Sequence, residues 1–157
     1  MVNMADPINM TMIDDKVVTG AGKILTFDGT NNKVDLSHTG EVALGISAGE
    51  SERAAGGSYD LTAPTVSMYP LGGALMVQSE ASRAYTTGCP VYIGASGMAT
   101  SVSASNKKLG LYLGAGETAP ALTLNGVGDL IVVAGTSGTG LLEGGMILVN
   151  TAGAEIA

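Results

Sequence analysis

The residues of this chain that could do chemistry are few and widely spaced. His38 is the only histidine, and it follows Ser37 with Asp35 nearby, which are the residue types of a Ser-His-Asp triad. Adjacent residues on a β segment point to opposite faces, so Ser37 and His38 cannot share one site. His38 and the only cysteine, Cys89, also provide too few ligands for a zinc ion. We therefore expect no catalytic residue, no metal and no cofactor.

The remaining polar motifs favour structural roles. Cys89 cannot form an intrachain disulfide, and we expect it to be a small buried hydrophobic residue rather than a reactive thiol. The glycine-rich run 135–145 lacks the Gly-Lys-Ser/Thr ending of a phosphate-binding loop, so a flexible hairpin is expected there. The carboxylate pairs Asp14-Asp15 and Glu50 with Glu52 lie on polar segments, where the expected role is solubility.

Composition sets the fold class. The 157 residues are enough for one ordinary domain, and 45% hydrophobic against 13% charged residues predict a chain that folds. The 24 glycines disfavour helices, because glycine costs about 1 kcal/mol in a helix interior. With no Trp and one Phe, the core must be built from Val, Leu, Ile, Met and Ala. An all-β domain is expected, stabilised further by association with something larger.

Net charge excludes one class of partner. The formal charge is −7 with only seven basic residues, which gives no basic patch for a phosphate backbone, so direct nucleic-acid binding is not expected. The first residues lack the basic and apolar regions of a signal peptide, and no window reaches the roughly 18 apolar residues of a membrane span. We expect no membrane association, and residence in an aqueous compartment unless the protein leaves within an assembly.

Two segments share a pattern that suggests an internal repeat. The segment 88–114 contains two apolar β-like runs joined by a glycine turn and a serine-rich crossing, and a similar unit occupies 22–46. When Gly22 is set against Gly88, Phe27 falls on Ile93 and Gly45 falls within one position of Gly110. Two copies of one β unit predict a single barrel or sandwich.

Strand signals recur about every ten residues, which is typical of a compact β-barrel or sandwich with short strands and little helix. Proline removes a ladder donor, so Pro64 and Pro70 should lie at strand ends or sheet edges. Asp28–Asn32 should be a turn rather than a calcium loop, because it lacks the glutamate and spacing of an EF-hand. The expected strands are Lys23–Phe27, Lys33–Leu36, Glu41–Ala48, Tyr59–Leu61, Val66–Tyr69, Leu75–Gln78, Val91–Ile93, Leu109–Leu113, Leu122–Leu124, Leu130–Val133 and Met146–Val149.

The first 18 residues differ in character from the rest, with four methionines before any strand signal. We expect an extended N-terminal arm over 1–18 and one β-barrel-like domain over 19–157, of which 134–157 either belongs to the domain or packs on a partner. The arm would add to a partner's sheet edge, and its deletion should leave a folded core. A frayed terminus is the alternative. The expected contact residues are Met4, Pro7, Ile8, Met10, Met12 and Ile13.

Five short motifs, in order, carry a family resemblance over roughly 20–133. They are Gly22-Lys23-Ile24-Leu25, Ala43-Leu44-Gly45-Ile46-Ser47, Gly72-Gly73-Ala74-Leu75-Met76-Val77, Gly88-Cys89-Pro90-Val91-Tyr92 and Lys108-Leu109-Gly110-Leu111. Their succession resembles the decoration (cement or head-stabilising) proteins of tailed viruses. Where that family often has an acidic residue before Val-Tyr, this chain has Cys89-Pro90.

The resemblance implies a non-enzymatic virion protein on the outer surface of an icosahedral capsid, assembled in the host cytoplasm. It implies a β-barrel-like domain, commonly a homotrimer, whose partners are the major capsid protein and further copies of itself. Such a protein would stabilise joints between capsomers against internal pressure. The alternative is a β-rich module of a virion fibre, tail or surface layer that recognises glycans, for which the available aromatic platforms are Tyr59, Tyr69, Tyr85, Tyr92 and Tyr112.

Overall fold

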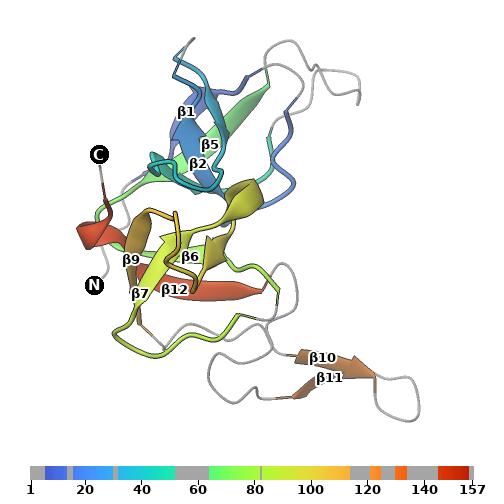
Figure 1. The fold of residues 1–157 in the computed structure, drawn as a ribbon. Helices are drawn as coiled ribbons and strands as arrows, with labels where there is room; N and C mark the ends of the chain where they lie inside the picture. The colour runs from blue at the N-terminus through green and yellow to red at the C-terminus, as the bar shows by residue number, and fades with distance from the viewer. Residues whose placement is uncertain are drawn as a thin grey trace.

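The computed structural model describes residues 6–13, 16–29, 32–51, 64–81, 83–113, 121–124, 130–133 and 145–155. Its regular structure is almost entirely β: two five-stranded antiparallel sheets, a separate two-stranded pair and two short 3-10 turns. The two large sheets are stacked in a sandwich-like arrangement, with the blue-to-green sheet above the green-to-red sheet in Figure 1. The prediction of a compact β fold with short strands and little helix is confirmed.

The first sheet is built from the N-terminal part of the chain and has the strand order β1-β5-β4-β2-β3. All of its named strand pairs are antiparallel. We call these five strands the first unit. They are β1 (Ile8–Thr11), β2 (Ile24–Phe27), β3 (Val34–Leu36), β4 (Gly45–Ser47) and β5 (Thr65–Pro70).

The second sheet has the order β6-β12-β9-β7-β8, and we call it the second unit. Two strands, β10 (Ala121–Leu124) and β11 (Leu130–Val133), pair only with each other and lie in the connection between β9 and β12. The second unit consists of β6 (Ala74–Gln78), β7 (Pro90–Ile93), β8 (Ala99–Thr100), β9 (Lys108–Tyr112) and β12 (Met146–Asn150), with the 3-10 turns η1 (Ala95–Gly97) and η2 (Thr151–Gly153).

The two units have the same topology. Counted along the chain within each unit, the strands of both sheets follow the order first, fifth, fourth, second, third. Their registers also agree: Gly45 lies opposite Leu25 in the first unit, and Gly110 lies opposite Val91 in the second. The corresponding segments are 8–12 and 75–79, 22–28 and 88–94, 34–41 and 99–106, 44–48 and 109–113, and 64–69 and 145–150.

This correspondence confirms the repeat seen in the sequence and extends it. Gly22 and Gly88 both have positive φ, at 85° and 81°, and each donates its backbone N–H to the fourth strand of its unit, at the Ser47 and Tyr112 carbonyls. Phe27 and Ile93 are the last residues of β2 and β7. The sequence led us to expect two copies that build a single barrel or sandwich, and the copies do form a sandwich-like pair of sheets. Each copy recruits two further strands and completes a sheet of its own.

Each sheet curls until its edge strands meet at one residue pair. Met12, just after β1, forms an isolated parallel bridge with Val34, and Ser79, just after β6, forms the equivalent bridge with Ala99. The bridging segments are held by hydrogen bonds from Ile13 N–H to the Val34 carbonyl at 2.9 Å and from Glu80 N–H to the Ala99 carbonyl at 2.9 Å. Because only single pairs join the edges, neither sheet is a closed barrel.

Two hydrophobic clusters fill the molecule. The first unit encloses a small cluster, to which Met10, Leu36 and Leu44 are added as partly buried members. The larger cluster fills the second unit and takes in Ile24, Ala43 and Ile46 from the first. In β2, the neighbours Ile24 and Leu25 therefore serve different clusters, because successive strand residues point to opposite faces. The buried members of the small cluster are Met12, Val18, Leu25, Val34, Val66 and Met68.

The units are joined by backbone hydrogen bonds as well as by the shared cluster. Gln78 N–H donates to the Gly22 carbonyl at 2.8 Å, and the Gln78 side chain donates to the Ala21 carbonyl at 2.8 Å. At another point of the junction, Gly97 N–H donates to the Ser37 carbonyl at 2.9 Å. The sandwich is thus fixed in register at two separate places.

The N-terminal segment is extended, as expected, but it is part of the fold from Ile8 onward. β1 pairs with β5 over its whole length, and Met12 and Val18 are both 0% exposed in the small cluster. The alternation of Met10 and Met12 does place both side chains on one face, but that face covers this chain's own core. Removal of residues 1–18 would take the two core side chains Met12 and Val18 with it, so the structure argues against the expectation that the core stays folded without this segment.

Most expected strands are present, with shorter bounds in places. The expected strand Glu41–Ala48 is reduced to Gly45–Ser47, and Tyr59–Leu61 lies outside the described residues. Pro64 precedes β5 and Pro70 ends it, as predicted from the missing N–H donor. In the turn after β2, Gly29 and Asn32 have the positive φ values expected of turn residues, 76° and 55°.

Candidate interaction surfaces

An apolar groove lies where the two sheets meet. Its volume is about 280 Å³, and its lining comes from β4, β5, β6 and β12 together with the segment before β2. Met76, Met146 and Leu148 belong to the outward-facing positions of β6 and β12, and each remains partly exposed. The other lining residues are Ala21, Gly22, Ile46, Ser47, Tyr69, Ala74 and Leu75.

The fold itself does not require this groove to be apolar. The corresponding outward positions of the first unit are Asn9, Thr65 and Ser67, all polar, and the Ser67 hydroxyl donates to Asn9 Oδ1 at 2.6 Å. The same backbone thus carries a polar outer face in one unit and an apolar outer face in the other. Apolar side chains that remain partly exposed at such positions make the groove a candidate contact surface.

The groove was not singled out from the sequence. The segments Ala74–Gln78 and Met146–Asn150 are apolar at consecutive positions, so both faces of each strand carry apolar side chains. Such a run normally indicates a strand buried on both sides. Here one face of each strand covers the core and the other lines the groove. The apolar runs in the sequence were therefore compatible with a groove but did not distinguish it from a fully buried strand.

The predicted contact residues of the N-terminal segment divide into three groups. Met4 lies outside the described residues. Pro7 is exposed, and Ile8 is 47% exposed opposite Met68, one residue before the groove residue Tyr69. Met10 and Ile13 are partly buried, while Met12 is buried completely and is not available to a partner. Of the predicted contact residues that the structure describes, only Pro7 and Ile8 are exposed.

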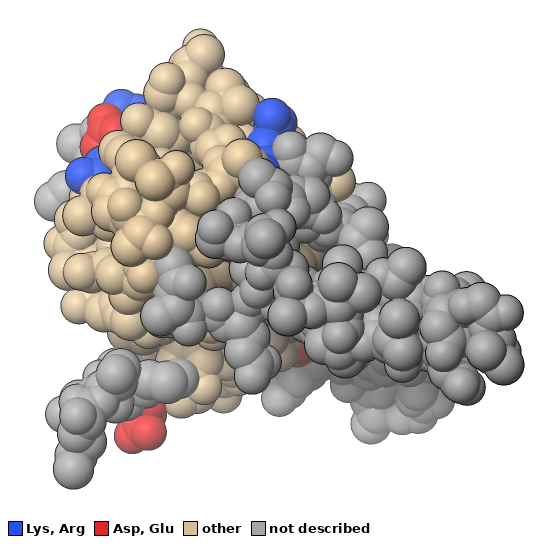
Figure 2. All heavy atoms as spheres, turned by 90° about the horizontal axis from the view of Figure 1, so that it is seen from below, with Lys and Arg blue, Asp and Glu red and all other residues tan. Residues whose placement is uncertain are grey.

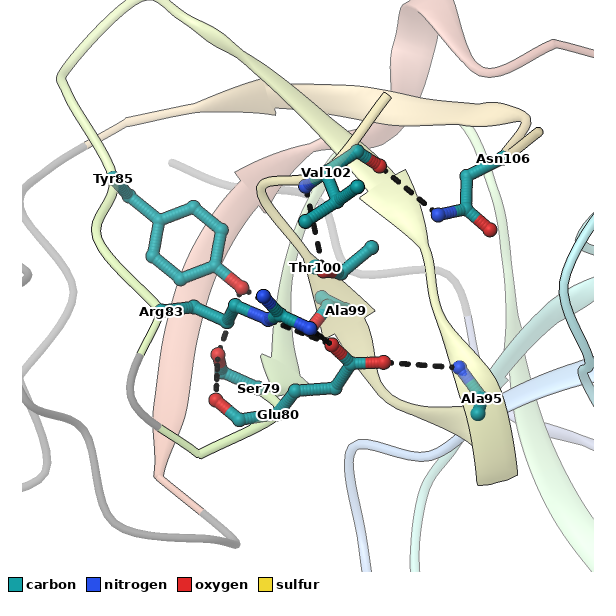
Figure 3. A network of polar contacts seen from close by, with 9 residues as sticks. All are labelled: Ser79, Glu80, Arg83, Tyr85, Ala95, Ala99, Thr100, Val102 and Asn106. Atoms are coloured by element: carbon teal, nitrogen blue, oxygen red, sulfur yellow. Dashed lines mark hydrogen bonds and ion pairs between the residues drawn. The ribbon is translucent and has the colours of Figure 1, made fainter. Parts of the chain in front are cut away.

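A polar network closes the open edge of the second unit, as Figure 3 shows. Glu80 follows β6, and its carboxylate forms an ion pair with Arg83 and accepts the Ala95 N–H at 3.2 Å. Burial raises the pKa of Glu80, but hydrogen bonds from Arg83, Thr100 and Ala95 outweigh burial and lower the pKa below its usual value. A carboxylate held ionised by three donors joins the chain segments; it is not poised to give up a proton.

Tyr85 lies deeper in the same network. Its hydroxyl is 2.7 Å from the Ser79 hydroxyl and donates to the Ala99 carbonyl at 3.1 Å, across the bridge that joins the sheet edges (Figure 3). Burial is the main cause that raises the pKa of Tyr85 to about 12. The ring is 7% exposed and packs 5.4 Å from the Tyr112 ring, which is 2% exposed. Neither tyrosine can serve as a glycan platform, which leaves Tyr69 and Tyr92 partly exposed among those described.

The remaining chemical candidates lie apart. Ser37 is fully buried and His38 is exposed, so the structure places them on opposite sides of the strand, as predicted. His38 Nδ1 is 3.5 Å from Glu41 Oε2, in a turn exposed to solvent. Cys89 was expected to be buried and is exposed instead, because it lies in the turn before β7 and borders a surface hollow with Tyr92. No three His, Cys, Asp or Glu residues of the described part could together hold a metal ion.

The described surface carries little charge. Figure 2, seen from below, shows scattered charged side chains on a mainly uncharged described surface. Of the helices in the described ranges, none is long and apolar enough to span a bilayer. Comparison with protein-family models, with curated proteins and with solved structures finds no match to this chain.

Proposed function

We propose that this chain is a structural virion protein that binds the outer surface of an icosahedral capsid and stabilises the joints between capsomers. The observation that carries the proposal is the apolar groove of about 280 Å³, whose outer-face residues have polar counterparts in the other unit of the same fold. The family resemblance of the strand motifs supplies the kind of partner, a major capsid protein.

We include the start of β1 in the proposed contact surface. Pro7 and Ile8 are exposed there, and β1 pairs with β5, the strand that contributes Tyr69 to the groove. Apolar surface removed from water contributes roughly 25 cal/mol per Å² to binding. Low surface charge keeps the desolvation cost of such a contact small.

The mechanism is mechanical. A rigid two-unit β sandwich seated across a joint hides capsid surface that would be re-exposed if the joint opened. Any protein that binds the closed joint and not the open one shifts the equilibrium towards the closed form. Internal pressure from packaged DNA must then overcome the binding free energy as well as the contacts of the capsid itself.

The proposal is tested with a variant in which the outer face of the second unit carries the polar residues of the first unit. The variant Met76→Asn, Met146→Thr, Leu148→Ser carries at each position the residue found at the corresponding place in the first unit. It should fold and lose most of its co-sedimentation with purified heads of the virus that encodes the chain. Ser103→Ala, in the separate hollow near Tyr92, is the matched control and should bind normally.

Two results would contradict the proposal. One is equal binding of the groove variant and the natural chain to heads. The other is binding of the natural chain to a glycan array, lost on changing Tyr69 or Tyr92 to Ala while head binding is absent, which would favour the glycan-recognition alternative.

A further inference from the structure

The contact between the two units uses a different surface of each. The first unit contributes β2 and the end of β3. Just after β3, the Ser37 carbonyl accepts a hydrogen bond from the Gly97 N–H at 2.9 Å. The second unit contributes the turn after β7: a Cβ atom on Gly97 would lie 2.9 Å from Leu36 Cδ2 and 3.0 Å from the Ile24 carbonyl oxygen. We call these the strand face and the turn face. The pairing of unlike faces makes the contact heterologous.

Because the two units have the same fold, each has both a strand face and a turn face. The contact within the chain uses only one strand face and one turn face, so one strand face and one turn face remain unpaired. The unused turn face belongs to the first unit: Phe27 corresponds to Ile93, and Asn32 corresponds to Gly97, with φ of 55° and 70°. Ile93 is 0% exposed, whereas Phe27 is 49% exposed beside a hollow of about 310 Å³. The first unit thus presents an apolar turn face like the one that the second unit buries.

The unused strand face belongs to the second unit. Val102 corresponds to Ser37, which is buried in the junction, yet Val102 is 38% exposed. Pro90 corresponds to the buried Ile24 and is also exposed. The described part has only three exposed large hydrophobic residues, Ile8, Phe27 and Val102, and two of them fall on the unused faces.

The two units are related by a nearly pure rotation. The turns 38–41 and 103–106 correspond, since Glu41 N–H donates to the His38 carbonyl and Asn106 N–H donates to the Ser103 carbonyl. These equivalent turns touch: a Cβ atom on Gly40 would lie 3.4 Å from the Ser105 carbonyl oxygen. Equivalent points can meet only close to the rotation axis, and only when the shift along that axis is small. The unlike faces show that the rotation is not twofold. Repetition of such a rotation, without a shift along its axis, closes a ring when the angle is a whole fraction of a turn.

We propose that a second copy of this chain docks head to tail. The turn face of one copy's first unit, with Phe27 and Asn32, packs on the strand face of the next copy's second unit, with Pro90, Ser101 and Val102. Repetition of the contact closes a ring of copies in which every unit has both neighbours. This association does not depend on whether the protein binds viral heads.

The experiment uses variants that each damage one face. Phe27→Asp places a charge on the turn face, and Val102→Asp places a charge on the strand face. Both variants should fold, because both side chains are exposed and the hydrogen bonds of Val102 involve only its backbone. By analytical ultracentrifugation, the natural chain should form one species at a fixed multiple of the 15.6 kDa chain mass. Each variant alone should associate at least about tenfold more weakly.

Mixing the variants distinguishes head-to-tail docking from symmetric pairing. In an equimolar mixture, the intact strand face of Phe27→Asp meets the intact turn face of Val102→Asp, so a dimer should form and grow no further. Ile8→Asp, which changes the third exposed hydrophobic residue, should assemble like the natural chain. Should either aspartate variant fail to fold, as judged by circular dichroism, the corresponding serine variant replaces it.

Cross-linking gives a second readout. In a Cys89→Ser background, Asn32→Cys with Val102→Cys should yield disulfide-linked multimers on oxidation, because these positions correspond to the contacting pair Gly97 and Ser37. A natural chain that stays monomeric over a hundredfold range of concentration would overturn the proposal. So would a mixture of the two aspartate variants that remains monomeric, or an assembly that neither variant weakens.

Discussion

At the scale of single residues, the closest backbone contacts of the fold occur at two equivalent glycines. A Cβ atom on Gly45 would lie 2.5 Å from the Tyr69 carbonyl oxygen, and one on Gly110 would clash with the Asn150 carbonyl oxygen. Gly45 and Gly110 occupy the fourth strand of each unit and face its fifth strand. Both positions therefore require the absence of a side chain, and this explains why the two copies share a glycine there.

We expect Gly45→Ala and Gly110→Ala each to lower the free energy of unfolding by about 1–3 kcal/mol, the usual cost of overpacking. The measurement is urea denaturation followed by circular dichroism. Gly73→Ala is the matched control, because nothing lies within 4 Å of its Cβ position, and its effect should stay within roughly 0.5 kcal/mol. Equal, small effects at all three positions would contradict the packing described for the fourth strands.

Glu80 makes the stability of the second unit depend on pH. Its folded pKa lies below the ordinary value of 4.5, so its contribution is present above that value and is lost as the pH falls through the folded pKa. Glu80→Gln should be less stable near neutral pH, and its stability should fall less on acidification than that of the natural chain. Thermal unfolding across about pH 7 to 3 tests this, with the exposed Glu50→Gln as control. An unchanged acid response would exclude this role for Glu80.

At the scale of elements, β1 combines two roles that its sequence does not separate. Met10 and the following Met12 pack in the small cluster of the first unit, while Pro7 and Ile8 are exposed at the surface. One short strand therefore serves both the fold and the proposed contact surface. The boundary between the two roles falls near Ile8.

Two truncations test this boundary. Deletion of residues 1–7 should leave the unfolding midpoint nearly unchanged, because β1 and the small cluster remain. Deletion of residues 1–18 removes β1, Met12 and Val18, and it should destabilise the chain by several kcal/mol, since each large buried side chain contributes roughly 2–5 kcal/mol. Urea denaturation measures both. A longer truncation as stable as the natural chain would show that this segment does not fill the core.

At the scale of the whole molecule, two similar units share one hydrophobic cluster. Ile24, Ala43 and Ile46 belong to the first unit by sequence and to the core of the second unit by packing. Loss of either unit would expose these side chains and break the hydrogen bonds of Gln78 and Gly97. We therefore expect the junction to couple the stabilities of the two units.

Native-state hydrogen exchange should show this coupling. The slowest amides of β2 and of β12 should exchange with the same free energy of opening, equal to the global free energy of unfolding. Gly97→Ala, placed where its Cβ would press on Leu36 and Ile24, should lower both values together. If β2 exchanged by an opening clearly easier than that of β12, the units would be independent.

The fold class, most strand positions and the presence of a repeat were predictable from the sequence, because these follow from local composition, turn residues and the spacing of glycines. The match of Gly22 with Gly88 and of Gly45 with Gly110 could be recognised in the sequence because the same physical requirement selects glycine in both copies. Gly22 and Gly88 have positive φ, and Gly45 and Gly110 have no room for a Cβ atom.

How the two copies pair and pack depends on contacts between residues that are distant in the chain. Pairing between β1 and β5, or β6 and β12, joins residues far apart in the chain, and no local pattern specifies such partners. For the same reason, the sequence could not show that Met12 is buried while Ile8 is exposed, or that Cys89 lies at the surface. The apolar groove and the two unused faces exist only where separate strands come together in space.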